Sequence, residues 1–215
     1  MAKCMGGSNL QPLNPIMKPS NALSSAMDAA LKDLLENQKF DSIYGVQEGS
    51  AVLASWPSIP CKIIFLDFDG VLNSDESIQN LGTKYQFSKS SIVALNELLK
   101  ENSTHIVVTS TWREGWTLKE NAEFLERDGL VPGRVIGKTP SLAQERGFEI
   151  DAWLRSVPFA VVSFVILDDR DDMAMHRNRL VQTNAKIGLT MNEVERARNV
   201  LQKLLPNQIG ANLRG

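Results

Sequence analysis

The stretch that most constrains the fold is residues 63–73, Ile-Ile-Phe-Leu-Asp-Phe-Asp-Gly-Val-Leu-Asn. An apolar run of strand length ends in Asp67 and Asp69, and Gly70 follows. A short apolar run bounded by a turn signal predicts a strand buried on both faces. Because side chains alternate along a strand, we expect the two carboxylates to point the same way at its carboxyl end. Two carboxylates held close together repel each other unless a cation or a proton lies between them. The stretch therefore indicates a metal site or an acid/base pair.

Length, charge and cysteine usage set broad limits. A length of 215 residues allows one domain of ordinary size with extensions, or two small domains. The formal net charge of −2 is close to neutral, so it points to no particular partner, although a local basic patch is compatible with it. Cys4 and Cys61 lie far apart, which argues against a disulfide framework and fits a reducing compartment. No apolar run reaches transmembrane length and no secretory signal is recognisable, so we expect a cytoplasmic protein without a membrane partner.

Strands and helices are expected to alternate after residue 60. Short apolar runs predict strands, and capping signals followed by periodic apolar positions predict helices. The strands expected after residues 63–66 are 105–109, 135–136, 159–167 and 180–182. The expected helices begin after Ser88, run from a capping box at Thr117 to Gly129, span 147–155, and run from a second box at Thr190 to Pro206. This alternation predicts an α/β fold with a central parallel sheet.

The chain is expected to have three regions. Residues 1–60 are predicted to be an extension that is partly disordered, because its first 20 residues lack periodicity. Within it, residues 25–38 carry an apolar stripe typical of an amphipathic helix, which packs on the main domain or meets a partner. Residues 61–206 are expected to form the main domain, and residues 207–215 a C-terminal tail.

Polar side chains follow three of the predicted strands at the points where those strands end. They are the pairs Asp67/Asp69, Ser110/Thr111 and Asp168/Asp169. Open α/β sheets bind ligands at this edge, and Arg146 begins the helix before the third of these strands. Carboxylates, a hydroxyl and a fixed cation suit phosphoryl transfer, which needs a nucleophile, a divalent metal such as Mg²⁺ and donors to the phosphoryl oxygens. The chain lacks the phosphate-loop motif Gly-x-x-x-x-Gly-Lys-Ser/Thr, which argues against a P-loop enzyme.

Six short motifs resemble those of a known superfamily. They are Leu-Asp-Phe-Asp-Gly-Val-Leu-Asn at 66–73, Thr-Ser-Thr-Trp-Arg at 109–113, Ile-Gly-Lys-Thr-Pro at 136–140, the segment 146–154, Ile-Leu-Asp-Asp at 166–169 and Arg-Leu-Val-Gln-Thr at 179–183. Over residues 62–205 the sequence resembles the haloacid dehalogenase-like (HAD) phosphohydrolases, and within them the HAD domains associated with Swiss Army Knife RNA repair proteins. The resemblance implies a Rossmann-like three-layer fold and a phosphatase that uses Mg²⁺.

The resemblance also implies roles for individual residues. Asp67 would be the nucleophile that forms an aspartyl-phosphate. Asp69 would protonate the leaving group and then act as the base for water, with its backbone carbonyl on Mg²⁺. Ser110 would donate a hydrogen bond to the phosphoryl group.

The cationic and metal-binding positions follow from the same resemblance. Arg146 would occupy a place usually held by lysine, where it keeps the charge but differs in donor geometry. Lys138 is the alternative for that place. Asp169 would ligate Mg²⁺, and Asp168 and Asp172 would be further ligands or supporting acids. The spacing of Asp172 departs from the commonest patterns of the superfamily, so its role is left open.

Several residues near these motifs have two interpretations. Arg113 either binds the substrate phosphate or pairs with Glu114 or another acid. Thr111 is assigned to substrate binding, as is Lys138 if Arg146 holds the cationic position. Trp112 and Trp116 either stack nucleobases or serve as half-buried packing.

The spacing of the motifs leaves little room for a second domain over the site. Residues 73–88 can hold only a loop or a short helix, and residues 146–168 hold one helix and one strand. We therefore expect no sizeable cap domain and an open site. An open site admits a phosphate on a large molecule. This favours a macromolecular substrate such as a nucleic-acid end or a phosphoprotein, and the resemblance favours nucleic acid.

Two other classes of function compete with a phosphatase. One is a receiver-like module that stores phosphate on an aspartate. In receivers the acidic pair comes early and the phosphoacceptor follows on a later strand, whereas here the Asp-x-Asp pair comes first and the second acidic pair comes late. The other is a non-catalytic module that binds phosphate or Mg²⁺ on a HAD fold. This alternative stays open because Arg146 stands where the resemblance implies a lysine. A bare Asp-x-Asp-Gly also occurs in ordinary turns, so the assignment depends on its place after a buried strand and on the order of the other motifs.

Overall fold

The structure is a computed structural model that describes residue 57 and residues 60–205. The predicted helix at 25–38 and the tail at 207–215 lie outside the described residues. The predicted boundaries of the three regions therefore stay predictions. The last helix ends at Leu201, earlier than the predicted end at Pro206, and residues 202–205 are not helical.

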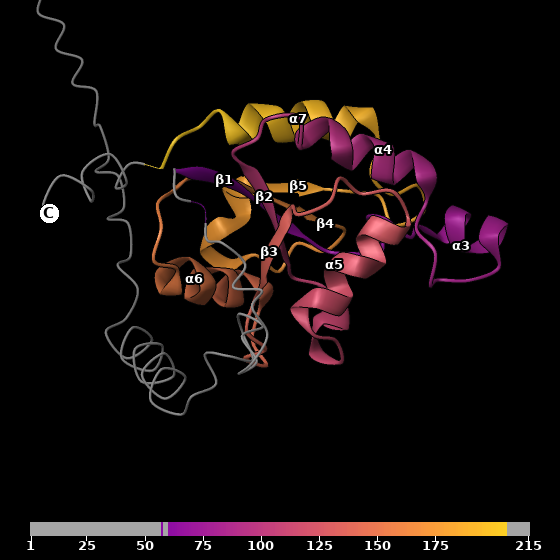
Figure 1. The fold of residues 1–215 in the computed structure, drawn as a ribbon, viewed down its shortest axis with the longest axis horizontal. Coiled ribbons are helices and arrows are strands. Elements are labelled where there is room, and N and C mark those ends of the chain that lie inside the picture. Colours follow the sequence, from indigo (N-terminus) through magenta and orange to yellow (C-terminus); the bar gives the residue numbers. More distant parts are fainter. Residues whose placement is uncertain (1–56, 58–59, 206–215) are drawn as a thin grey trace, which may run out of the picture.

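The described chain is built on a five-stranded parallel sheet in the order β3-β2-β1-β4-β5 (Figure 1). The strands are β1 (Cys61–Leu66), β2 (Thr104–Val108), β3 (Val135–Lys138), β4 (Val161–Asp168) and β5 (Leu180–Gln182). The opening apolar run forms β1, which lies at the centre, where burial on both faces requires apolar side chains. In the register of the sheet, Leu66 pairs with Val108 on one side and Leu167 on the other. The residues that follow these three therefore leave the sheet at the same edge.

Helices cover both faces of this sheet and make three layers. On one face, α4 (Lys89–Leu98), α5 (Leu118–Arg127) and α7 (Met191–Leu201) pack their apolar sides into the larger core cluster. On the other face, α6 (Arg146–Ser156) and the 3-10 helix η2 (Ala174–Arg179) flank a smaller cluster that contains Trp153. Figure 1 shows α4 and α7 on one side of the sheet and α6 on the opposite side. The expected three-layer α/β fold is confirmed.

The capping signals in the sequence determine where the helices start. The side chain of Ser88 accepts a hydrogen bond from Ser91 N at the start of α4. Thr117 and Thr190 begin α5 and α7 with complete capping boxes, as predicted. Strand limits were predicted within two residues: β4 begins at Val161 rather than at 159, and β3 continues to Lys138 rather than ending at 136.

The chain between the motifs contains no inserted domain within residues 60–205. A short helix, α3 (Asp75–Leu81), fills the gap between 73 and 88, and α6 and β4 fill the gap between 146 and 168. A second 3-10 helix, η1 (Thr111–Glu114), follows β2 and was not predicted. The expectation of no sizeable cap holds for this part of the chain. None of the helices in the described ranges has the length and apolar character needed to cross a membrane.

Gly70 is the residue that lets the loops after β1 and β4 meet. Its φ is +71°, a left-handed backbone conformation that residues with a side chain rarely adopt. A Cβ at this position would lie 2.6 Å from Cγ of Asp169. The hydroxyl of Thr183 donates to the Gly70 carbonyl at 2.8 Å and fixes the turn. Glycine is therefore required for the acids of both loops to share one place.

Candidate active site

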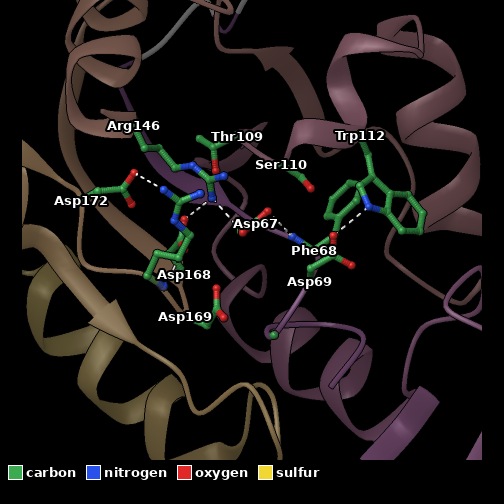
Figure 2. Close-up of polar contacts among 12 residues, drawn as sticks. Asp67, Phe68, Asp69, Thr109, Ser110, Trp112, Arg146, Asp168, Asp169 and Asp172 are labelled. Carbon is green, nitrogen blue, oxygen red and sulfur yellow. Dashed lines mark hydrogen bonds and ion pairs between the residues drawn. The ribbon is translucent and has the colours of Figure 1, made fainter. Parts of the chain in front are cut away.

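A buried ion-pair cluster connects three elements at the carboxyl edge of the sheet (Figure 2). Asp67 directly follows β1, Asp168 is the last residue of β4, and Arg146 is the first residue of α6. Arg146 Nη1 lies 2.8 Å from Asp67 Oδ2 and also contacts Asp168 Oδ2. All three residues are at most 5% exposed. Desolvation acts against the charge of Arg146, but the two carboxylates outweigh it and raise the pKa of the guanidinium above its usual range.

The position of Arg146 depends on a close approach between α6 and the loop after β4. Gly147 N–H donates to the carbonyl of Asp172 at 3.2 Å. A Cβ on Gly147 would lie 2.0 Å from the carbonyl oxygen of Met173, so a larger residue does not fit without movement of the backbone. The start of α6 is thereby held beside β4, and Arg146 is directed at the strand ends.

Three carboxylates form a group that suits a divalent cation. Oxygen atoms of Asp67, Asp168 and Asp169 lie within 4.8 Å of one another. Burial and the charge of Asp67 raise the pKa of Asp168 to about 7, against the opposing effect of Arg146. Desolvation and Asp67 also raise the pKa of Asp169. Three carboxylates facing one guanidinium leave negative charge in excess, and oxygen donors of this kind fit Mg²⁺.

Asp69 lies apart from this group and has different partners. Its side chain is exposed, and its carboxylate accepts hydrogen bonds from Trp112 Nε1 at 2.9 Å and from Asn73 Nδ2 at 2.8 Å (Figure 2). We expected Asp67 and Asp69 to point the same way, but they contact different groups. The reason is that β1 ends at Leu66, so the alternation of an extended strand does not continue through the turn at Gly70.

A hydroxyl group without a partner completes the edge. Ser110 is fully buried, and its Oγ has no hydrogen-bond partner among the described residues. The neighbouring Thr109 Oγ1 is also buried and has no hydrogen-bond partner among the described residues. Figure 2 shows the Ser110 hydroxyl between Asp67 and Trp112, at the side of the space that the carboxylates border. A buried hydroxyl costs free energy when it is unpaired, so a ligand that accepts its hydrogen bond would be stabilised here.

Arg113 makes its hydrogen bonds and its ion pair inside the protein. It is buried, and its guanidinium donates to the carbonyls of Thr109 at 2.7 Å and Ser110 at 2.9 Å. It also donates to Thr139 O at 3.0 Å and forms a 2.6 Å ion pair with buried Glu149. Of the two interpretations of Arg113, these contacts favour pairing with an acid, and the acid is Glu149 rather than Glu114. Burial raises the pKa of Glu149 against the opposing effect of Arg113, which leaves this pair deeply desolvated.

Lys138 has a similar supporting position. Its Nζ donates to the carbonyl of Arg113 in η1 at 2.9 Å and to that of Trp116, two residues after η1, at 2.8 Å. Arg146, and not Lys138, therefore contacts Asp67. Thr111 is exposed at the start of η1, and its assignment to substrate binding stays a prediction. Asp172 pairs with Arg170 at 2.7 Å rather than joining the three carboxylates.

Trp112 is the residue whose position sequence reasoning did not anticipate. The two interpretations of this side chain were packing and base stacking. The structure shows in addition that Trp112 donates a hydrogen bond to Asp69. Its half-buried ring packs against Phe68, Phe87 and Phe124, with centroids 5.7, 6.1 and 5.5 Å away. The signal available in the sequence was that Trp112 follows β2 at the same sheet edge as Asp69.

The sheet, the acids at the ends of its central strands and the arginine that joins them define a phosphohydrolase domain of the HAD type. The model of the family described as the HAD domain in Swiss Army Knife RNA repair proteins matches residues 63–194, and the chain belongs to this family. The family places it in the HAD phosphohydrolase superfamily.

Comparisons with individual proteins add little. No curated protein matches the chain. Among solved structures, the chain is similar to the Legionella pneumophila effector Ceg4 in its crystal structure. The identity is 13% and the TM-score is 0.45, with coverage of 73% of this chain and 99% of that chain.

Proposed function

We propose that the protein is an Mg²⁺-dependent phosphatase that works through an aspartyl-phosphate on Asp67. The observation that carries this proposal is the arrangement at the sheet edge. A buried carboxylate next to Arg146 lies near the Ser110 hydroxyl, which has no partner among the described residues, and a separate acid, Asp69, lies beyond it (Figure 2). A nucleophile, a donor to the phosphoryl oxygens and an acid/base are thus present in one place.

In the first step, an oxygen of Asp67 attacks phosphorus and the bond from phosphorus to the leaving oxygen breaks. Asp69, in its protonated form, gives its proton to that oxygen. Arg146 and the Ser110 hydroxyl stabilise the charge on the phosphoryl oxygens. The product is an acyl-phosphate on Asp67 and an alcohol that departs.

In the second step, the Asp69 carboxylate takes a proton from water as the water oxygen attacks phosphorus. The bond between phosphorus and the Asp67 oxygen breaks, inorganic phosphate leaves, and both aspartates return to their starting state. Trp112 and Asn73 hold both oxygens of the Asp69 carboxylate, so this base has a fixed direction although it is exposed. The same two hydrogen bonds would position the acid in the first step.

Asp67 and Asp169 would hold Mg²⁺. Asp168 lies beside them and forms an ion pair with Arg146. The resemblance adds the backbone carbonyl of Asp69 as a ligand. When bound, Mg²⁺ would neutralise the excess negative charge and allow an anionic phosphate to approach Asp67.

The substrate we propose is a phosphate on a large molecule, with a nucleic-acid end as the leading candidate. The absence of an inserted domain within residues 60–205 supports access by a macromolecule. The family is described by its occurrence in RNA repair proteins, which favours a nucleic acid. We propose a cytoplasmic location, in keeping with the sparse cysteines.

The test is hydrolysis by the full-length protein, with Mg²⁺ or with EDTA, of acetyl phosphate, phosphopeptides and oligonucleotides phosphorylated at the 3′ or the 5′ end. We expect Mg²⁺-dependent release of phosphate that is lost in Asp67→Asn and retained in Asp171→Asn, which changes an exposed acid in the loop after β4. Acid-quenched protein should carry phosphate on Asp67 by mass spectrometry.

Three results would contradict the proposal. Unchanged turnover in Asp67→Asn would exclude Asp67 as the nucleophile. An acyl-phosphate that persists for minutes would favour the receiver-like module. Stabilisation by Mg²⁺ without turnover of any phosphate ester would favour the non-catalytic module.

A further inference from the structure

We propose that Lys84, Tyr85 and Trp112 form a subsite that binds the nucleobase of the nucleotide carrying the phosphate. This inference rests on the proposed function and names its substrate class, a nucleic-acid end. We call these three residues the base subsite.

The base subsite begins where the leaving group must be. Asp69 is the group that protonates the leaving oxygen, and Trp112 Nε1 is 2.9 Å from Asp69 Oδ2. The Tyr85 ring lies next to the Trp112 ring, with centroids 5.6 Å apart. Lys84 Nζ lies 5.5 Å from the centroid of the first ring and 5.8 Å from that of the second. A group attached to the leaving oxygen therefore comes within reach of two aromatic rings and one ammonium.

The backbone that carries Lys84 and Tyr85 is held in place. Asn73 Nδ2, which also binds Asp69, is 3.2 Å from the Lys84 carbonyl. Arg127 Nη2 donates to the Tyr85 carbonyl at 2.7 Å. Tyr85 is nevertheless 57% exposed. An exposed aromatic ring on a fixed backbone loses little conformational freedom when a flat ligand stacks on it.

The chemistry of this subsite selects among the large substrates. Aromatic faces stack on any nucleobase, and an exposed lysine attracts the adjacent phosphodiester. A phosphoserine or phosphothreonine side chain offers no ring to stack. A groove of about 440 Å³ beside Trp116 is lined by Trp116, Glu120, Glu123, Phe124 and Arg127. The carboxylates of Glu120 and Glu123 repel an anionic strand. We therefore expect the strand to run along Lys84 rather than through this groove.

The experiment compares two dinucleotides that carry the same terminal phosphate, one with a base and one abasic at the phosphorylated residue. Each is tested with the phosphate at the 3′ end and at the 5′ end. We expect kcat/KM of the wild-type protein to be about tenfold or more higher on the base-bearing substrate for one of these ends, as stacking on aromatic side chains predicts. Tyr85→Ala should reduce this ratio towards one, mainly through a higher KM, whereas Tyr85→Phe should keep it. Lys84→Ala should raise KM more than Lys119→Ala, which removes an exposed lysine on α5.

The outcomes separate this inference from the proposed function. Hydrolysis of both dinucleotides at the same kcat/KM by the wild-type protein would overturn the base subsite and leave the phosphatase intact. Faster turnover of a phosphotyrosine peptide than of either dinucleotide would overturn it in favour of a phosphoprotein. No Mg²⁺-dependent turnover of any phosphate, acetyl phosphate included, would overturn the phosphatase itself. Because the comparison of substrates uses the wild-type protein, the result does not depend on the folding of a variant.

Discussion

Arg146 determines the charge balance of the site. One guanidinium contacts two buried carboxylates, and a third, Asp169, lies beside them. Both contacts are made by the same nitrogen, Nη1, and a guanidinium keeps its charge when it is buried between two acids. We therefore expect an arginine to serve at the position where the resemblance implies a lysine.

The excess of negative charge predicts how stability depends on pH. The pKa of Asp168 is raised to about 7, above the value of about 3.9 for an exposed aspartate. The folded state then holds this proton more tightly than the unfolded state, so the stabilisation is complete below about pH 4 and is lost as pH rises through about 7. In EDTA, we expect Tm to fall between pH 5 and pH 8 by several degrees more in wild type than in Asp168→Asn, which cannot ionise. Mg²⁺ should raise the wild-type Tm more at pH 8 than at pH 5. Parallel curves of Tm against pH would contradict this role for Asp168.

Ser110 offers a test in which activity and stability separate. Its buried hydroxyl has no partner in the described part of the chain, so Ser110→Ala removes an unsatisfied group. We expect Tm to stay equal or rise slightly, since an unpaired buried hydroxyl costs about 1 kcal/mol or more. At the same time kcat/KM should fall by about a hundredfold, the typical loss of one donor to a developing oxyanion. Ser141→Ala, at an exposed serine that binds Glu114, should not lower kcat/KM. A drop in Tm with unchanged turnover would assign Ser110 to the fold alone.

Trp112 is expected to act through Asp69. Trp112→Phe keeps a ring in the aromatic cluster but removes the 2.9 Å hydrogen bond. We expect kcat to fall by about tenfold on an alkyl phosphate, whose leaving oxygen needs a proton, and by less on p-nitrophenyl phosphate. The KM should change little. Trp116→Phe, which trims a ring of the same cluster, is the matched control. Equal losses on both substrates would indicate that Trp112 serves packing alone.

At the scale of elements, the contact between α6 and the loop before η2 decides where the guanidinium lies. Gly147→Ala would place a Cβ 2.0 Å from the carbonyl oxygen of Met173, so the start of α6 and this loop must move apart. We expect a lower Tm and a loss of most activity, because Arg146 moves with the start of the helix. Gly115→Ala, where the added Cβ meets nothing within 4 Å, should change neither. Chemical denaturation and kcat measurements of both variants test this, and a Gly147→Ala protein with wild-type activity would contradict it.

At the scale of the whole molecule, the part of the chain that the structure describes places no second domain over the site. Within residues 60–205, the intervals that could hold a cap contain α3 in one case and α6 with β4 in the other. We therefore expect kcat/KM on a phosphorylated oligonucleotide to stay at least as high as on the matching mononucleotide as its length increases from two to about twelve nucleotides, since residues 60–205 insert no domain that would exclude the strand. Steady-state kinetics on a length series test this. A progressive decrease with length would indicate that something covers the site.

Much of the fold followed from local patterns. The run that forms β1, the capping boxes at Thr117 and Thr190 and the short strand at 180–182 are recognisable because hydrophobic burial and helix capping act over a few residues. The edge at which Asp67, Ser110 and Asp168 meet was also predictable, since parallel strands end together.

Only the tertiary structure decided which side chains within that edge contact one another. Arg146 rather than Lys138 meets Asp67, because α6 is seated against the loop after β4 through Gly147. Arg113 is directed inward to Glu149, and Trp112 is directed to Asp69. These pairs are separated by 36 and 43 positions in the chain, so no local pattern encodes them. The sequence by itself determined that acids gather at the end of β1. The packing of helices and loops around the sheet determined that Asp67 lies buried beside a cation while Asp69 lies exposed beside an indole, because the direction of a side chain after a strand ends depends on the turn and on the elements packed against it.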